Sequence, residues 1–167
     1  HVVSRTGRHP SSLSPVLVGV HGGPDEQRVL DAAIEIAQRR SAPLIVVHVV
    51  ATRPSAAVAV PSAAGAVALT GEELADRCHL DCEIALAGTD LEWSFEIHAG
   101  DAARELVGAA RNHMAACIVV GRHAHRTPVG RYRCTAIRVA GNSRQPVLIV
   151  PPPEPASESF DDPPTTT

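Results

Sequence analysis

The sequence contains no lysine: all fifteen basic residues among its 167 residues are arginine. Without lysine, neither Schiff-base chemistry nor the lysine that holds phosphates in a P-loop is available. The sequence also has no Gly-x4-Gly-Lys-Ser/Thr loop, no Gly-x-Ser-x-Gly elbow and no Ser-His-Asp arrangement. These absences argue against catalysis, and we expect a binding or regulatory protein rather than an enzyme.

Aromatic residues are also scarce, at 2% of the chain, whereas hydrophobic residues make up 44%. The core of the predicted single domain must therefore be built from alanine, valine, leucine and isoleucine. No run of about 18 apolar residues is present, which predicts that no helix spans a membrane. The net charge of −3 gives no general attraction to nucleic acid or anionic membranes, so we expect neither as a partner.

The four cysteines, Cys78, Cys82, Cys117 and Cys134, do not form the pattern of a disulfide framework. Cys117 falls within a predicted buried strand, and the chain is long enough to fold without disulfides. Cys78 and Cys82 share one predicted helical face, which favours two core residues over half of a metal site. Reduced cysteines and the absence of a signal-peptide pattern predict a cytoplasmic protein.

Five short segments have the composition of β-strands. Four are continuous and rich in β-branched residues, as expected of parallel strands covered on both faces. The fifth, Glu92–Ile97, alternates apolar and polar residues, which predicts a half-exposed strand at a sheet edge. The four continuous segments are Val16–Val20, Leu44–Val50, Cys117–Val120 and Val147–Val150.

Helical patterns lie between these strands. Thr70 with Glu73 forms a capping box at the start of the second pattern, and Asp101 is expected to cap the third. Strands and helices alternate, which predicts a doubly wound α/β fold with a parallel sheet between two helical layers. The helical patterns cover residues 24–40, 70–88, 101–112 and 135–141.

The composition divides the chain into a domain and two tails. We expect the domain to span residues 15–151, with a mobile loop at 51–69 that is rich in alanine, valine and proline. Residues 1–14 and 152–167 are rich in proline, serine and threonine, which predicts disordered tails.

The last third of the domain is its most informative part. A buried strand, Cys117–Val120, leads through Gly121 into a loop. A helix begins near Thr135, and the strand Val147–Val150 follows it. This layout resembles the universal stress protein family over residues 15–151. The resemblance implies a Rossmann-like sheet with strand order 3-2-1-4-5 and a homodimer formed through the final strand, which is apolar and would otherwise leave an exposed edge.

In that family the loop carries Gly-x2-Gly-x9-Gly-Ser/Thr and holds the phosphates of ATP. Gly121 and Thr135 match this motif, whereas Ala124 and Cys134 stand at two of its glycine positions. A shifted register would place Arg133 and Cys134 at the Gly-Ser pair. In either register, the resemblance implies that binding of ATP or another adenine nucleotide, with Mg²⁺, is weakened, altered or lost.

The candidate nucleotide site lies at the carboxyl ends of the first and fourth strands, where doubly wound sheets bind ligands. His21 stands where the family has an aspartate that contacts the nucleotide. Arg122 and Arg126 could hold a phosphate through guanidinium forks in place of glycine amides; alternatively, they are solvated residues of an arginine-rich chain. The candidate nucleotide-binding residues are His21, Gly22, Val49, Gly121, Arg122, Ala124, Arg126, Cys134 and Thr135.

Two other functions remain open on the sequence. His21, His123 and His125 are a ligand set for a metal-assisted or nucleotide hydrolase, although no carboxylate is evident beside them to orient a ring. The other is a ligand-free dimeric scaffold that binds a regulatory protein partner. His48 lies in a buried strand and is expected to be a core histidine, and Cys134, beside a helix start and arginines, is expected to be the reactive thiol.

Overall fold

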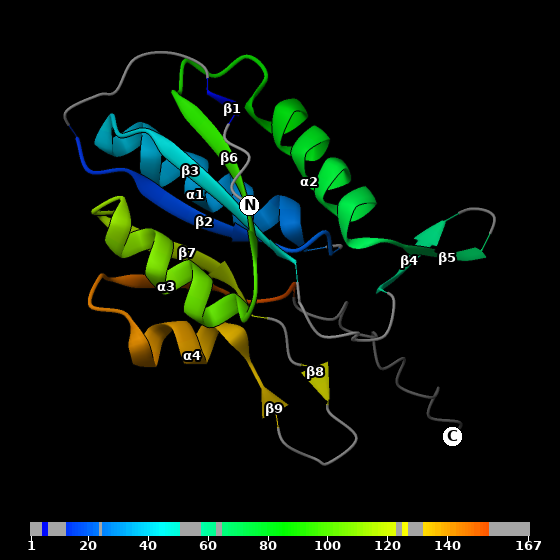
Figure 1. Ribbon diagram of the computed structural model, residues 1–167. Coiled ribbons are helices and arrows are strands. Elements are labelled where there is room, and N and C mark those ends of the chain that lie inside the picture. The colour runs from blue at the N-terminus through cyan, green and yellow to red at the C-terminus, as the bar shows by residue number, and fades with distance from the viewer. Residues whose placement is uncertain are drawn as a thin grey trace, which may run out of the picture.

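A computed structural model describes residues 5–6, 13–23, 25–50, 58–62, 65–122, 125–126 and 132–153. Its main sheet has six strands in the order β1-β6-β3-β2-β7-β10 (Figure 1). The order of the five parallel strands, 3-2-1-4-5, confirms the predicted doubly wound α/β fold. These strands are β2 (Val16–Val20), β3 (Leu44–Val50), β6 (Trp93–Ala99), β7 (Cys117–Gly121) and β10 (Val147–Val150).

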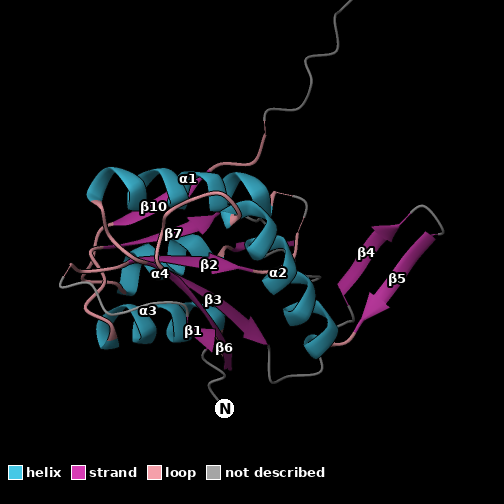
Figure 2. Cartoon of the chain, turned by 90° about the horizontal axis from the view of Figure 1, so that it is seen from above, coloured by secondary structure: helices cyan, strands magenta, loops and turns pink. Residues whose placement is uncertain are grey.

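Helices cover both faces of the sheet (Figures 1 and 2). The side chains of α1 and α2 pack into one core cluster, and those of α3 and α4 pack into another on the opposite face. The four helices are α1 (Glu26–Arg40), α2 (Gly71–Leu86), α3 (Ala102–Asn112) and α4 (Thr135–Asn142). This arrangement explains the continuous apolar strands, because successive side chains of β2 enter different cores: Val16 and Val18 one, Leu17 the other.

Both predicted helix caps are present. The Thr70 hydroxyl accepts a hydrogen bond from the Glu73 amide, and the Glu73 carboxylate accepts one from the Thr70 amide at 2.8 Å. The Asp101 carboxylate accepts a hydrogen bond from the Arg104 amide at 3.1 Å. These caps satisfy amide groups that the first turn of a helix otherwise leaves without a partner.

Strand β6 differs from the prediction in two respects. A short strand, β1 (Arg5–Thr6), pairs antiparallel with it, so β6 is not the outermost of the described strands. Its polar face is also covered, since Glu96 is only 6% exposed and contacts the histidine that ends α3. The alternating pattern predicted which residues share a face, but it could not show that a helix covers the polar one.

The segment predicted as a mobile loop, 51–69, contains a β-hairpin that sequence reasoning did not anticipate. Its strands, β4 (Val58–Ser62) and β5 (Gly65–Leu69), pair antiparallel and extend away from the sheet near the start of α2 (Figure 2). A second short pair, β8 (His125–Arg126) and β9 (Tyr132–Arg133), follows β7. Most residues of the two predicted tails lie outside the described ranges. Among the described helices, none has the length and apolar character that crossing a bilayer requires.

Candidate functional site

A pocket of about 220 Å³ opens at the carboxyl ends of β2, β3 and β7. This is the point where the strand order reverses, and it is where the sequence predicted the site. Four predicted residues line the pocket: His21, Val49, Gly121 and Thr135. The other walls are mainly apolar side chains from both helical layers and the central strands, as is usual for small-molecule sites.

The other predicted residues take different places. Gly22 has a positive φ of 79°, and a Cβ there would lie 2.4 Å from Leu74 of α2, so the tight turn requires glycine. Arg122 is exposed and does not line the pocket. Of the remaining candidates, Cys134 is the N-cap residue of α4, Arg126 and His125 belong to β8, and Ala124 and His123 lie outside the described residues.

A larger hollow, of about 510 Å³, lies at the opposite edge of the sheet, where α1 and α2 end. Its lining includes Ser41, Thr89 and Glu92, and none of the predicted site residues. Ligands of doubly wound sheets bind outside the carboxyl ends of the strands. We therefore assign the site to the smaller pocket.

Glu26 is the site residue that sequence reasoning missed. Its position in the first turn of α1 is typical of an acidic residue that interacts favourably with the helix dipole. In the structure it is 5% exposed, lines the pocket and folds back over the turn. Its Oε2 atom accepts hydrogen bonds from the amides of His21, at 2.8 Å, and of Gly22. The carboxylate that appeared to be lacking beside His21 is therefore present, with Oε2 3.7 Å from His21 Nδ1.

Burial is the main influence on the pKa values of Glu26 and of the two cysteines near it, Cys78 and Cys82. Burial raises the pKa of Glu26 above its usual value, although its two backbone hydrogen bonds and the Cys78 thiol act in the opposite direction. Burial, with the nearby Glu26 carboxylate, also raises the pKa of the Cys82 thiol to about 12 and that of Cys78 further. Both thiols are fully buried and stay protonated, which confirms that they are core residues.

His48 is also a core residue, as predicted. It is 3% exposed, and burial lowers its pKa despite a hydrogen bond to the Val20 backbone. Its Nδ1 atom has no hydrogen-bond partner among the described residues. The lowered pKa favours the neutral form of the ring, which lies on the same face of β3 as Leu44 and Val46.

Two helices begin at the pocket. Ala102 and Thr135, the first residues of α3 and α4, both line it. Asp101, which caps α3, also accepts two hydrogen bonds from Arg138 of α4, at 2.8 and 2.9 Å. This bidentate pair holds the two helix starts together, and it raises the pKa of the Arg138 guanidinium. The positive ends of two helix dipoles at one pocket favour an anionic group there.

The α4 terminus is the better placed of the two for an anion. Cys134, its N-cap residue, makes no side-chain capping hydrogen bond, unlike Asp101 at the start of α3. The first amides of α4 can therefore donate to a ligand. Among the described residues, no group of three or more His, Cys, Asp or Glu side chains is arranged so that it could hold a metal ion.

The universal stress protein family model matches residues 13–151 of the chain. The chain belongs to the universal stress protein family. This universal stress protein resembles several solved members of the family in its fold, whereas comparison with curated proteins gave no significant match.

Three of these structures illustrate the likeness. A universal stress protein solved in complex with cAMP is 23% identical, with a TM-score of 0.62 over 84% of this chain and 98% of that one. The Archaeoglobus fulgidus protein in complex with dAMP is 20% identical, with a TM-score of 0.56 over 82% and 97%. UspA from Lactobacillus plantarum is 19% identical, with a TM-score of 0.62 over 84% and 99%.

We predict that Cys134 is the fastest-reacting thiol of the native protein. Burial raises the pKa of Cys117, which lies in β7, and makes it a poor nucleophile, whereas Cys134 is the N-cap residue of α4 and its side chain makes no capping hydrogen bond. Brief labelling with a maleimide, followed by peptide mass spectrometry, should modify Cys134 before Cys117. Equal labelling of both would contradict the prediction.

Proposed function

We propose that this universal stress protein is a cytoplasmic regulatory module that binds an adenine nucleotide through its base and sugar, with weakened recognition of the outer phosphates of ATP. The observation that carries the proposal is the pocket at the reversal point of the sheet, where Val49, Gly121 and Thr135 meet. Family members of the same fold have been solved with dAMP and with cAMP.

The lining of the pocket combines two kinds of chemistry. Val47, Val49 and Val120 provide an apolar surface suited to a purine ring. The helix start at Thr135 is suited to a single phosphate group. Ala124 and Cys134 replace the two glycines that would bring backbone amides close to further phosphates. The expected ligand is therefore a nucleoside monophosphate as much as ATP, and Mg²⁺ is expected only with the triphosphate.

Isothermal calorimetry with AMP, cAMP and Mg-ATP at low salt tests this proposal. We expect saturable binding of AMP near one site per chain, with an affinity for ATP no more than about threefold higher, because the outer phosphates gain few contacts. The absence of heat and of thermal stabilisation with every adenine nucleotide at millimolar concentration would instead favour the ligand-free scaffold.

Catalysis is not part of the proposal. Oε2 of Glu26 accepts two backbone hydrogen bonds and lies 3.7 Å from His21 Nδ1, beyond hydrogen-bond distance, so the structure offers no positive evidence for a catalytic pair. The protein is expected to act by presenting a nucleotide-dependent surface to a regulatory protein partner.

We also propose a homodimer formed through β10. Among the described strands, β10 pairs only with β7, so its other edge presents unpaired backbone groups. Leu148, in the middle of this strand, is 42% exposed. A second copy that pairs edge to edge would cover both the leucine and the backbone.

The substitution Leu148→Arg should convert the dimer to a monomer and change the stability of the fold by less than about 0.5 kcal/mol, since the side chain is exposed. Sedimentation velocity measures the change in mass. Ile137→Arg, at an exposed apolar position on α4, is the matched control and should remain dimeric. A dimer that survives Leu148→Arg but not Ile137→Arg would place the interface on α4.

A further inference from the structure

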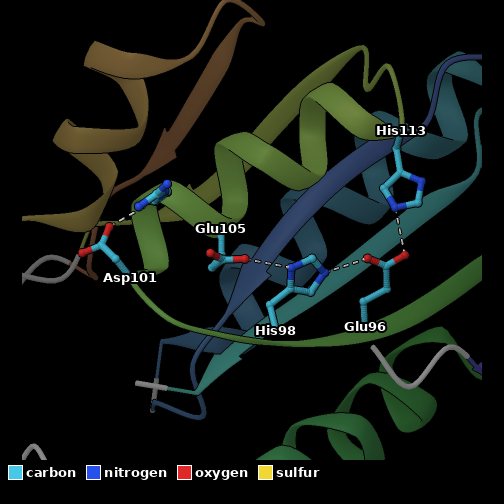
Figure 3. Close-up of polar contacts among 6 residues, drawn as sticks. Glu96, His98, Asp101, Glu105 and His113 are labelled. Carbon is cyan, nitrogen blue, oxygen red and sulfur yellow. Dashed lines mark hydrogen bonds and ion pairs between the residues drawn. The ribbon is translucent and has the colours of Figure 1, made fainter. Parts of the chain in front are cut away.

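Four titratable side chains join β6 to both ends of α3. Glu96 and His98 belong to β6, Glu105 to the first turns of α3, and His113 is the C-cap residue of that helix. Figure 3 shows that carboxylates and imidazoles alternate along the network in the order Glu105, His98, Glu96, His113. We refer to this set as the β6–α3 network.

Glu96 is the centre of the network. Its side chain is only 8% exposed, and each of its oxygens meets one imidazole: Oε2 lies 2.9 Å from His98 Nε2, and Oε1 lies 2.9 Å from His113 Nε2. A carboxylate buried to this degree requires charged or hydrogen-bonding partners. The two histidines supply these partners from different elements. Removing either histidine would therefore leave one oxygen of a buried carboxylate without a partner, which is unfavourable.

His98 lies between two carboxylates. Its second ring nitrogen, Nδ1, is 3.4 Å from Glu105 Oε2. A neutral imidazole has a single N–H and an ionised carboxylate has none, so a neutral His98 can donate to Glu96 or to Glu105 but not to both. Both contacts are favourable only when one further proton is present, shared between His98 and Glu105.

The backbone makes room for this contact. Gly100 has a positive φ of 148°, and a Cβ at this position would lie 3.1 Å from Glu105 Oε1. A larger residue there would strain the backbone and crowd Glu105. The turn between β6 and α3 is thus built so that Glu105 can reach back to His98.

Within the described residues, each ion pair made by Glu96, His98, Glu105 or His113 joins two members of the network. Val47 and Val49 of β3 are in register with Glu96 and His98, and Arg5 of β1 is in register with Phe95. On the side of α4, Arg138 is engaged by Asp101.

We propose that the β6–α3 network is a proton-operated strap. With the additional proton on the His98–Glu105 contact, the strap holds α3 against β6; when that proton is lost, two acceptors face each other and the strap loosens. Ala102 and Leu106 of the same helix line the candidate pocket, so the strap connects pH to the position of one pocket wall. No oxidant, metal or second ligand is required.

Urea unfolding of the full chain between about pH 5 and 8, the range in which imidazoles titrate, tests the strap. His48, whose pKa the fold lowers, makes stability rise with pH, and it does so equally in the wild type and in Glu105→Gln. The contribution of the strap should instead fall with rising pH, because the proton that it holds is released on unfolding. Glu105→Gln should remove this dependence, because the side-chain N–H of glutamine can donate to the unprotonated Nδ1 of a neutral His98, which an ionised carboxylate cannot do. Relative to that of Glu105→Gln, the unfolding equilibrium constant of the wild type should increase by up to tenfold for each unit of rising pH. Tenfold per pH unit is the value for the release of one proton.

The matched control is Glu83→Gln, which neutralises the exposed carboxylate that pairs with His79 of α2 and should leave the wild-type pH dependence intact. Parallel pH profiles for wild type and Glu105→Gln would overturn the proposal. Should Glu105→Gln not fold, ring ¹⁵N NMR of the wild type decides: His98 should retain both ring protons at a pH where His79 has lost one, and the reverse order overturns the strap.

Discussion

Replacing Ala124 and Cys134 together by glycine is expected to raise the affinity for ATP at least tenfold and to leave the affinity for AMP within about twofold. The glycine motif brings backbone amides close to the outer phosphates, and a Cβ at either position prevents that approach. A hydrogen bond to a charged group contributes about 1.5–3 kcal/mol, and 1.4 kcal/mol corresponds to tenfold in affinity. Calorimetry with both nucleotides measures the two affinities in one series.

Two comparisons separate an effect on the backbone amides that contact the phosphates from a general effect of added glycine on flexibility. The single variants Ala124→Gly and Cys134→Gly show which position limits the phosphates. Ala87→Gly, at the C-cap of α2, adds glycine far from the site and should change neither affinity. If the double variant strengthened AMP and ATP equally, the added glycines would be acting on the pocket as a whole, and the explanation for weak ATP recognition would be wrong.

Glu26→Ala is expected to destabilise the fold by roughly 1–3 kcal/mol, because the His21 and Gly22 amides lose the acceptor that holds the turn above the pocket. Glu26→Gln keeps an acceptor oxygen and should be at least as stable as the wild type at neutral pH. For a domain of this size, 1 kcal/mol shifts the melting temperature by about 2–4 °C. Thermal melts of the three proteins at matched pH provide the measurement.

The pH dependence of this pair follows from the raised pKa of Glu26. A raised folded-state pKa contributes stability that is complete below the ordinary value of 4.5 and is lost as pH rises through the folded value. The stability of Glu26→Gln relative to wild type should therefore increase from acid toward neutral pH. A constant difference across this range would mean that Glu26 is not desolvated as the structure indicates.

The fold was predictable because its signals are local. Val16–Val20 and Val147–Val150 are runs rich in β-branched residues and are typical of buried parallel strands. The alternation of such strands with helices favours a doubly wound parallel sheet. The same rule places His21, Gly121 and Thr135 near one another, since each follows a strand end or begins a helix at the reversal point. These three residues were predicted and found together at the pocket.

The unpredicted features depend on long-range packing. Glu26 has the sequence context of a dipole-stabilising residue, and only the approach of α1 to the end of β2 turns its side chain back over His21. Glu96 has the context of an exposed strand residue, and its burial depends on His98 beside it and His113 at the far end of α3. Sequence periodicity assigns residues to a face, but it does not show which side chains cover that face.

Nucleotide binding in the pocket between β2 and β7 is tested most directly by NMR mapping with ¹⁵N-labelled protein. Addition of AMP should shift the amide signals of His21, Val49, Gly121 and Thr135, which line that pocket. Shifts centred instead on Ser41, Thr89 and Glu92, in the hollow at the opposite edge of the sheet, would contradict the assignment. Spectra unchanged at saturating AMP would contradict nucleotide binding itself.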